Sequence, residues 1–280
     1  MRIKILLIVN KLPILYRHRI ISFIKESLKI SNIDYKESLY SGINAKPFTF
    51  SLLMPANRTV RKGIIQIDKD FIIEDNIFTF DKDSYLSLFI SSYDYKFLLN
   101  LYNGIRKLKT FHFSSDDNML VDNDKIDIMV DKISVLNEKN TNNNEVVFKT
   151  NSPVIINDKD NKPISFENLN LFNENINIIE NKIFKSIIGR DLKKPLEFIP
   201  INIKKQVAKH TLSEFREKTH KPIMYLNGIE GIFELKGDVD DLNILYQKGL
   251  GLRTSQGFGM LEVIWKRGFT LAIGLLTQVL

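Results

Sequence analysis

One polar segment near the middle of the chain limits what it can fold into. Residues 137–144 read Asn-Glu-Lys-Asn-Thr-Asn-Asn-Asn and contain no apolar side chain. A run of this kind cannot bury apolar surface, so it is typical of a connection between two folded units. The sequence therefore predicts an N-terminal domain over residues 1–138, a linker over 139–145 and a C-terminal domain over 146–266. An apolar tail follows over 267–280.

The hydrophobic pattern predicts a similar order of elements on each side of the linker. In the first half, apolar alternation indicates strands, and apolar spacing of three and four indicates helices. We expect strands over 2–10 and 46–54, a short strand after residues 62–63, strands over 71–80, 105–113 and 126–136, and helices over 16–30 and 84–102. In the second half we expect strands over 146–149, 153–156, 196–203, 222–235 (a pair) and 260–265, and helices over 169–188 and 238–248. The fold class predicted is α+β, with two tandem ferredoxin-like (RRM-like) βαββαβ domains.

Composition excludes several functions. The 280 residues include no cysteine, which excludes disulfides and thiolate metal sites and favours a reducing, cytoplasmic location. No apolar run is long enough to cross a bilayer, so no membrane partner is expected. The sequence shows no histidine and carboxylate cluster at metal-ligand spacing, so neither a metal nor a cofactor is expected.

Positive charge is concentrated in one segment. Residues 114–181 hold 13 acidic and 6 basic residues, a local charge of −7, whereas residues 182–221 hold 11 basic and 4 acidic residues, a local charge of +7. Such a basic segment is typical of a protein that binds a polyanion, and a lysine-rich solvated surface is the alternative. We expect the predicted loop or hairpin over 204–221 to contact phosphates through Lys204, Lys205 and Lys209.

A glycine-rich loop precedes the last predicted strand. Four glycines, Gly249, Gly251, Gly257 and Gly259, surround Arg253, Thr254, Ser255 and Gln256. The loop lacks the Gly-Lys-Ser/Thr of a P-loop and the third glycine and helix of a dinucleotide fingerprint. Glycine backbone can approach a phosphate closely, so we expect the four glycines, Arg253, Ser255 and Gln256 to contact a phosphate backbone, with an ordinary flexible connection as the alternative. Phe258 could stack on a base or fill the core.

Several separate motifs resemble one family, the CRISPR-associated repeat-processing endoribonucleases (the sixth Cas family). They are Leu12-Pro-x-x-Tyr-Arg17, Lys46-Pro-Phe-Thr-Phe-Ser-Leu52, Asn151-Ser-Pro-Val154, Gly249-Leu-Gly251 and Ser255-Gln-Gly-Phe-Gly-Met260. The resemblance covers about residues 1 to 266. It implies binding of CRISPR repeat RNA and one metal-independent cut, in which the 2′-hydroxyl attacks the adjacent phosphorus. The products implied are a 2′,3′-cyclic phosphate and a 5′-hydroxyl, and the reaction yields mature guide RNAs. Other Cas proteins and a second copy of the chain are possible partners.

The resemblance also suggests catalytic residues, with one departure from the family pattern. Many members carry a histidine between the first helix and the next strand, where this chain has Leu39-Tyr40. The candidates are therefore Lys46, which matches the family's lysine before Phe-Thr, together with Lys25, Tyr40 and His18. Two alternatives remain open: a repeat-RNA-binding subunit of an effector complex with impaired cleavage, and an unrelated ferredoxin-like scaffold that does not prefer repeat RNA.

Overall fold

The computed structural model describes residues 1–42, 44–114 and 119–264, and the predicted apolar tail lies outside them. Two hydrophobic clusters form the cores of the two halves. The first draws its buried residues from Ile3 to Ile128, and the second from Val146 to Val263. Half-buried Ile223 packs against the first cluster although it belongs to the second half of the chain. The division at residues 138 and 146 stays a prediction.

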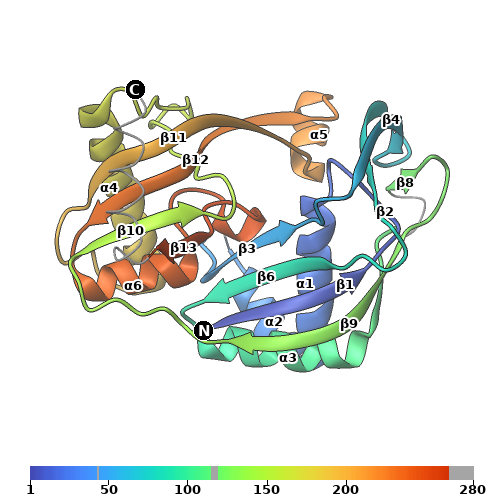
Figure 1. Cartoon of the computed structure of the whole chain (residues 1–280), viewed down its shortest axis with the longest axis horizontal. Helices are drawn as coiled ribbons and strands as arrows, with labels where there is room; N and C mark the ends of the chain where they lie inside the picture. Colours follow the sequence, from blue (N-terminus) through green and yellow to red (C-terminus); the bar gives the residue numbers. More distant parts are fainter. Residues whose placement is uncertain (43, 115–118, 265–280) are drawn as a thin grey trace.

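The N-terminal half is built on a five-stranded antiparallel sheet with strand order β3-β6-β1-β9-β7. The chain order β1, α1, β3, β6, α3, β9 with spatial order β3-β6-β1-β9 is the ferredoxin-like arrangement, and α1 packs on α3 (Figure 1). A second sheet, with strand order β2-β5-β4-β8, is formed by chain segments that lie between the elements of this ferredoxin-like unit. The elements are β1 (Arg2–Ile8), β2 (Lys11–Pro13), α1 (Arg17–Ser31), α2 (Ile33–Tyr40), β3 (Phe48–Leu53), β4 (Thr59–Gln66), β5 (Ile72–Thr79), β6 (Leu86–Ser92), α3 (Tyr95–Leu108), β7 (Thr110–His112), β8 (Leu120–Val121) and β9 (Asp127–Leu136).

The C-terminal half repeats this arrangement with a four-stranded antiparallel sheet of order β11-β12-β10-β13. Its elements are β10 (Glu145–Thr150), α4 (Leu169–Ile187), β11 (Glu197–His210), α5 (Ser213–Thr219), β12 (Met224–Lys236), α6 (Val239–Lys248), the 3₁₀ turn η1 (Thr254–Gln256) and β13 (Leu261–Ile264). The predicted fold class, α+β with two tandem ferredoxin-like units, is confirmed.

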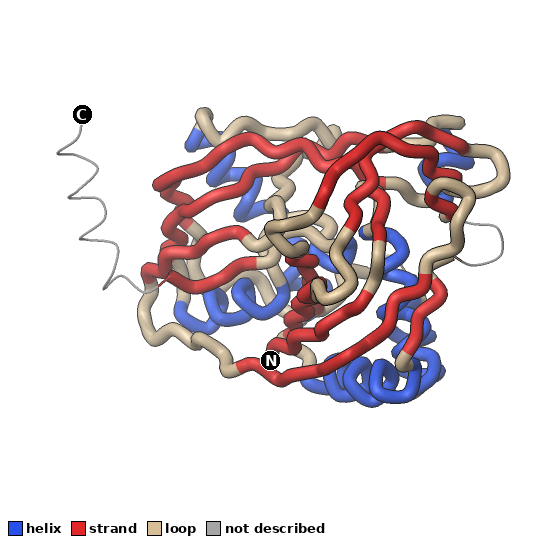
Figure 2. Tube along the Cα trace, turned by 45° about the vertical axis from the view of Figure 1, so that its right-hand side comes forward, coloured by secondary structure: helices blue, strands red, loops and turns tan. Residues whose placement is uncertain are grey.

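The long hairpin of β11 and β12 joins the two halves. It runs from the C-terminal sheet across to α5, which lies beside β4 of the N-terminal half (Figures 1 and 2). Two ion pairs hold it there. Lys209 Nζ lies 2.6 Å from Asp75 Oδ2, and Arg216 Nε lies 2.7 Å from Asp68 Oδ2. Because Asp75 is buried, the hairpin end is docked and not free in solvent.

Several predicted elements were wrong in type or extent. Residues 84–102 were expected to form one helix, but they form strand β6 followed by the start of α3. Residues 105–113 begin in α3 and only then reach β7. The strand expected over 196–203 continues as β11 to His210, so the basic segment forms the end of the β11–β12 hairpin together with α5. The pair expected over 222–235 is the single strand β12. Within the described residues no helix is long and apolar enough to span a membrane.

Candidate functional site

Three residues predicted from the sequence lie together, and we call them the lysine–tyrosine cluster. Lys25 comes from α1, Tyr40 ends α2, and Lys46 precedes β3. Lys25 Nζ lies 4.7 Å from the centroid of the Tyr40 ring, and Lys46 Nζ lies 5.4 Å from the same centroid. The short α2, which begins at an Asn32 side chain that accepts from the Tyr35 amide, carries Tyr40 back between the two lysines.

Burial sets the protonation of this cluster. The amine of Lys25 lies over the Tyr40 ring, and this partial desolvation lowers its pKa, although the side chain as a whole is exposed; the nearby charge of Lys36 lowers the pKa further. Burial also lowers the pKa of Lys46, with a second contribution from the charge of Lys25. The pKa of the Tyr40 hydroxyl is raised by burial, so this group keeps its proton. A lysine whose pKa falls can accept a proton more readily near neutral pH, while a charged neighbour stabilises an anion.

Two polar atoms in the cluster are buried without a hydrogen bond. Among the described residues, Tyr40 Oη and Lys46 Nζ have no hydrogen-bond partner. Burying such groups unpaired costs free energy, so they are typical of places where a ligand completes the bonding. Lys25 is exposed, and its side chain gives the cluster access to solvent.

His18, the fourth catalytic candidate, lies elsewhere. It precedes Lys25 by seven residues on α1, about 10 Å along the helix axis. Its neighbourhood includes His210, Arg19 and Arg216, and its pKa is lowered well below the usual value, mainly by burial and then by the charges around it. The structure thus brings three of the four candidates together and leaves His18 in a second group of residues.

That second group joins the start of α1 to the glycine-rich loop. His210 is 1% exposed and meets the Phe258 ring edge-on, with 5.9 Å between ring centroids. Burial lowers the pKa of His210 to about 3, and the charges of Arg17 and Arg253 add to this, so the ring is neutral at physiological pH. The Arg17 guanidinium lies 4.9 Å from the Phe258 ring centroid. Phe258 is therefore a buried packing residue in this structure.

The four loop glycines are required by close packing. All have positive φ, between 70° and 89°. A Cβ on Gly259 would lie 2.1 Å from the Leu250 carbonyl oxygen, one on Gly251 2.6 Å from the Ile155 oxygen, and one on Gly257 2.6 Å from the Phe50 ring. A Cβ on Gly249 would meet the Thr49 side chain at 2.9 Å. Their expected role in binding RNA stays a prediction.

Two motifs that are about 200 residues apart in the sequence meet at this loop. The Thr49 hydroxyl donates to the Phe258 carbonyl over 2.8 Å, and the Phe50 ring covers Gly257. Both side chains belong to the Lys46-Pro-Phe-Thr-Phe motif. The glycine-rich loop therefore packs on the strand that follows Lys46, which couples it to the lysine–tyrosine cluster through β3.

The outward part of the loop carries the other predicted RNA contacts. Arg253 is exposed, has φ 59°, and donates from Nη1 to Gln256 Oε1 over 2.9 Å. Ser255 and Gln256 are half-buried in η1. These three side chains lie on a loop whose glycines are closely packed against β3, Leu250 and Ile155.

A buried ion pair holds the start of the loop, and no sequence signal pointed to it. Lys248 Nζ lies 2.6 Å from Glu180 Oε2, and the two side chains are 1% and 0% exposed. The Gly251 amide donates to Glu180 Oε1 over 2.6 Å, and Lys248 donates to the Gly249 carbonyl over 2.9 Å. Glu180 lies four residues from both Ile176 and Phe184, and its place on the apolar face of α4 could have hinted at a buried partner.

The three predicted lysines of β11 differ in their surroundings. Lys204 and Lys205 are 72% and 62% exposed, and each lies within 4 Å of one carboxylate, on Glu230 and Glu167. Exposed pairs of this kind contribute little stability, so both lysines can exchange partners for a phosphate. Lys209 instead bridges the two halves of the chain through buried Asp75.

Comparison with known proteins adds to this geometry. Residues 136–263 match the family model described as "CRISPR associated protein Cas6, C-terminal". A protein of Methanocaldococcus jannaschii named CRISPR-associated endoribonuclease Cas6 1 is 26% identical over 254 residues, covering 89% of this chain and 86% of that protein.

Two solved structures share the fold over 95% of this chain. One is described as an RAMP protein binding different RNA substrates; it has a TM-score of 0.70 and 19% identity, and 100% of its own chain is covered. The other is the product of a Cas6-related gene from Pyrococcus furiosus, with a TM-score of 0.67, 21% identity and 99% covered. These matches confirm the resemblance indicated by the motifs: along most of its length, this chain is similar to the Cas6 family of CRISPR-associated proteins.

Proposed function

We propose that this protein is a Cas6-type endoribonuclease that binds the repeat in precursor CRISPR RNA and cuts it once. The observation that carries the proposal is the lysine–tyrosine cluster, in which Lys25, Tyr40 and Lys46 converge although they come from three different segments. The relative from Methanocaldococcus jannaschii, which aligns with most of the chain and is named as an endoribonuclease, supports the same class of activity.

The proposed reaction uses the RNA's own 2′-hydroxyl as nucleophile. The bond from O2′ to phosphorus forms as the bond from phosphorus to O5′ breaks, leaving a 2′,3′-cyclic phosphate and a 5′-hydroxyl. One group accepts the proton of the 2′-hydroxyl, and another donates a proton to the leaving 5′-oxygen. Positive charge is also required beside the phosphorane, where negative charge accumulates.

The cluster supplies side chains for each of these tasks. Lys25 is exposed and has a lowered pKa, so its neutral amine is suited to accept the proton. Tyr40 keeps its hydroxyl proton and can donate a hydrogen bond to a phosphate or to the leaving oxygen. Lys46 Nζ, buried and without a partner among the described residues, is suited to pair with the phosphorane oxygens. Arg253, Ser255, Gln256, Lys204 and Lys205 would hold the flanking RNA.

Cleavage of the cognate repeat RNA in EDTA tests the proposal. We expect a single cut that survives chelation and disappears when the nucleotide at the cut site lacks its 2′-hydroxyl. Lys46→Ala, Lys25→Ala and Tyr40→Phe should slow the cut. The matched control is Lys29→Ala, which removes an exposed lysine one turn further along α1 and should leave the rate unchanged.

A binding subunit with impaired cleavage is the second candidate function. The observation that favours it is Tyr40, which stands where the family pattern has a histidine and whose raised pKa makes it a poor proton acceptor. If binding of the repeat RNA is measured and saturated and the RNA still stays uncut, the protein is a binding subunit and not a nuclease. Equal binding of the repeat and a scrambled RNA would instead favour an unrelated scaffold and refute both.

A further inference from the structure

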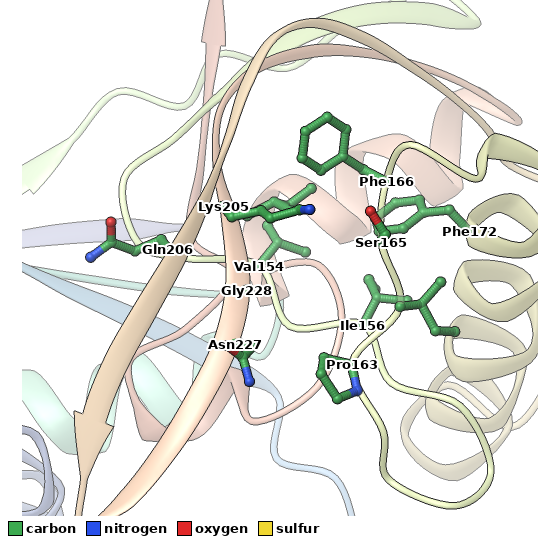
Figure 3. A pocket seen from close by; sticks show the side chains of 12 residues that line it. Val154, Ile156, Pro163, Ser165, Phe166, Phe172, Lys205, Gln206, Asn227 and Gly228 are labelled. Carbon is green, nitrogen blue, oxygen red and sulfur yellow. The ribbon is translucent and has the colours of Figure 1, made fainter.

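A pocket in the C-terminal half lies apart from the lysine–tyrosine cluster. It has a volume of about 260 Å³ and lies between the segment that follows β10 and the β11–β12 hairpin (Figure 3). Its floor is apolar, formed by buried Val154, Ile156 and Phe172. Every residue that lines it comes after position 153, whereas the cluster is built from residues before position 47.

Polar and aromatic groups surround the mouth of this pocket. Figure 3 shows Phe166 and Ser165 in the segment between β10 and α4, with Lys205 extending from β11 toward them. Asn227 of β12 lies nearer to Pro163 and is exposed. The pocket therefore combines an apolar floor that includes the Phe172 ring, a second aromatic ring from Phe166, side-chain amides, a hydroxyl and a cation.

These features match the chemistry of one nucleobase. Drug-sized ligands occupy pockets of about 300–1,000 Å³, so this volume suits something smaller, such as a single planar ring system. A base stacks its faces on aromatic and apolar side chains and presents hydrogen-bonding groups only along its edge. The amide of Asn227 and the hydroxyl of Ser165 can pair with such an edge, and Lys205 can pair with the adjoining phosphate.

We propose that this pocket holds one unpaired base of the RNA, at a nucleotide away from the cut site. The strand that forms its wall belongs to the basic segment, since Lys204 and Lys205 both project from β11 into solvent. An uncharged metabolite would gain nothing from that charge, whereas a nucleotide in a strand brings its phosphate with it. The inference rests on the proposed function, because it requires that the chain bind RNA.

An abasic scan of the repeat RNA tests the pocket. Each unpaired nucleotide of the repeat is replaced in turn by an abasic residue, and the dissociation constant is measured with the wild-type protein, Phe166→Ala and Asn227→Ala. We expect one position at which the abasic RNA binds the wild-type protein about tenfold or more weakly, the range expected for loss of one stacked base. At that position the two variants should bind intact and abasic RNA almost equally.

Lys204→Ala is the matched control. It removes a lysine from the same strand but not from the lining of the pocket, so it should weaken intact and abasic RNA by the same factor. A cleavage assay gives a second readout. Phe166→Ala should raise the RNA concentration that gives the half-maximal rate of cleavage, because the pocket contributes to RNA binding.

The outcomes separate this inference from the proposed function. Tight RNA binding with no position coupled to Phe166 or Asn227 would overturn the pocket and leave the nuclease proposal standing. No measurable RNA binding by the wild-type protein would overturn both. If Phe166→Ala fails to fold, Asn227→Ala carries the same comparison, because its side chain is exposed and makes little contribution to the core.

Discussion

Replacing Glu180 by glutamine removes the counter-ion of a fully buried lysine while keeping the shape of the side chain. The glutamine oxygen can still accept the hydrogen bond from the Gly251 amide, so the variant tests only the loss of the charge that compensates Lys248. Removing one partner of a buried ion pair costs about 3–5 kcal/mol, because the other charge is left without compensation. Since both side chains are at most 1% exposed, we expect Glu180→Gln to lower the free energy of unfolding by this amount.

A double-variant cycle separates charge from packing. Lys248→Met alone leaves a buried carboxylate and should also destabilise strongly, whereas Glu180→Gln combined with Lys248→Met leaves no unpaired charge. The double variant should therefore be more stable than either single variant in urea denaturation followed by circular dichroism. Glu174→Gln, at an exposed position of the same helix, is the matched control and should change the free energy of unfolding by less than about 0.5 kcal/mol.

The pH dependence gives the sign of the effect. Burial lowers the pKa of Lys248 in the folded protein although Glu180 opposes this, so the folded state binds fewer protons than the unfolded state at pH values between this lowered pKa and about 10.4. Stability therefore rises with pH between the folded and unfolded pKa values. In Glu180→Gln the pKa of Lys248 in the folded state falls further, because the charge that raised it is gone. The loss in free energy of unfolding relative to wild type should therefore become smaller from pH 7 to pH 9.5. Additive single variants, or a deficit that does not depend on pH, would refute the assignment of a charged pair.

Three further predictions concern the cluster and the contact between the two halves. Lys46→Ala should slow single-turnover cleavage by about 100-fold or more, while RNA affinity in a filter-binding assay changes by less than about threefold; a large loss of affinity with an unchanged rate would contradict the role in charge stabilisation. Lys36→Gln should raise the pKa of Lys25, because the charge of Lys36 contributes to lowering it, and the rising limb of the pH–rate profile should move to higher pH; an unmoved profile would exclude Lys25 as the proton acceptor. Asp75→Asn should cost about 1–2 kcal/mol in urea denaturation, since Lys209 can turn to solvent. Burial alone would raise the pKa of Asp75, but hydrogen bonds from Lys209 and the Asn76 amide lower it overall, so wild-type stability from this pair should be present above about pH 4 and be lost as pH falls below it.

Element types could be predicted wherever the hydrophobic period was long and uninterrupted. The helix α1, the Asp238 cap of α6 and the tandem βαββαβ order follow from local pattern, and the Asp238 side chain does accept from the amides of residues 240 and 241. Strand β6 was missed because its buried Leu86, Leu88 and Ile90 run directly into the apolar residues of α3. The change from a period of two to a period of 3.6 falls at Ser92 and Asp94, where only the Asp94 cap marks it.

Spatial relations between distant segments needed the tertiary structure. The sequence alone pointed to Lys25, Tyr40 and Lys46 as separate candidates, and the packing of α1, α2 and the start of β3 brings them within about 5 Å of one ring. The docking of the β11–β12 hairpin on the N-terminal half brings His210 near His18 and pairs Lys209 with Asp75. Local periodicity reports which face of an element is apolar, because that depends on neighbours three or four residues away. Contacts across the molecule, and the pKa shifts that follow from burial, join residues as far apart in the sequence as Glu180 and Lys248. Only the folded chain decides which of these side chains meet.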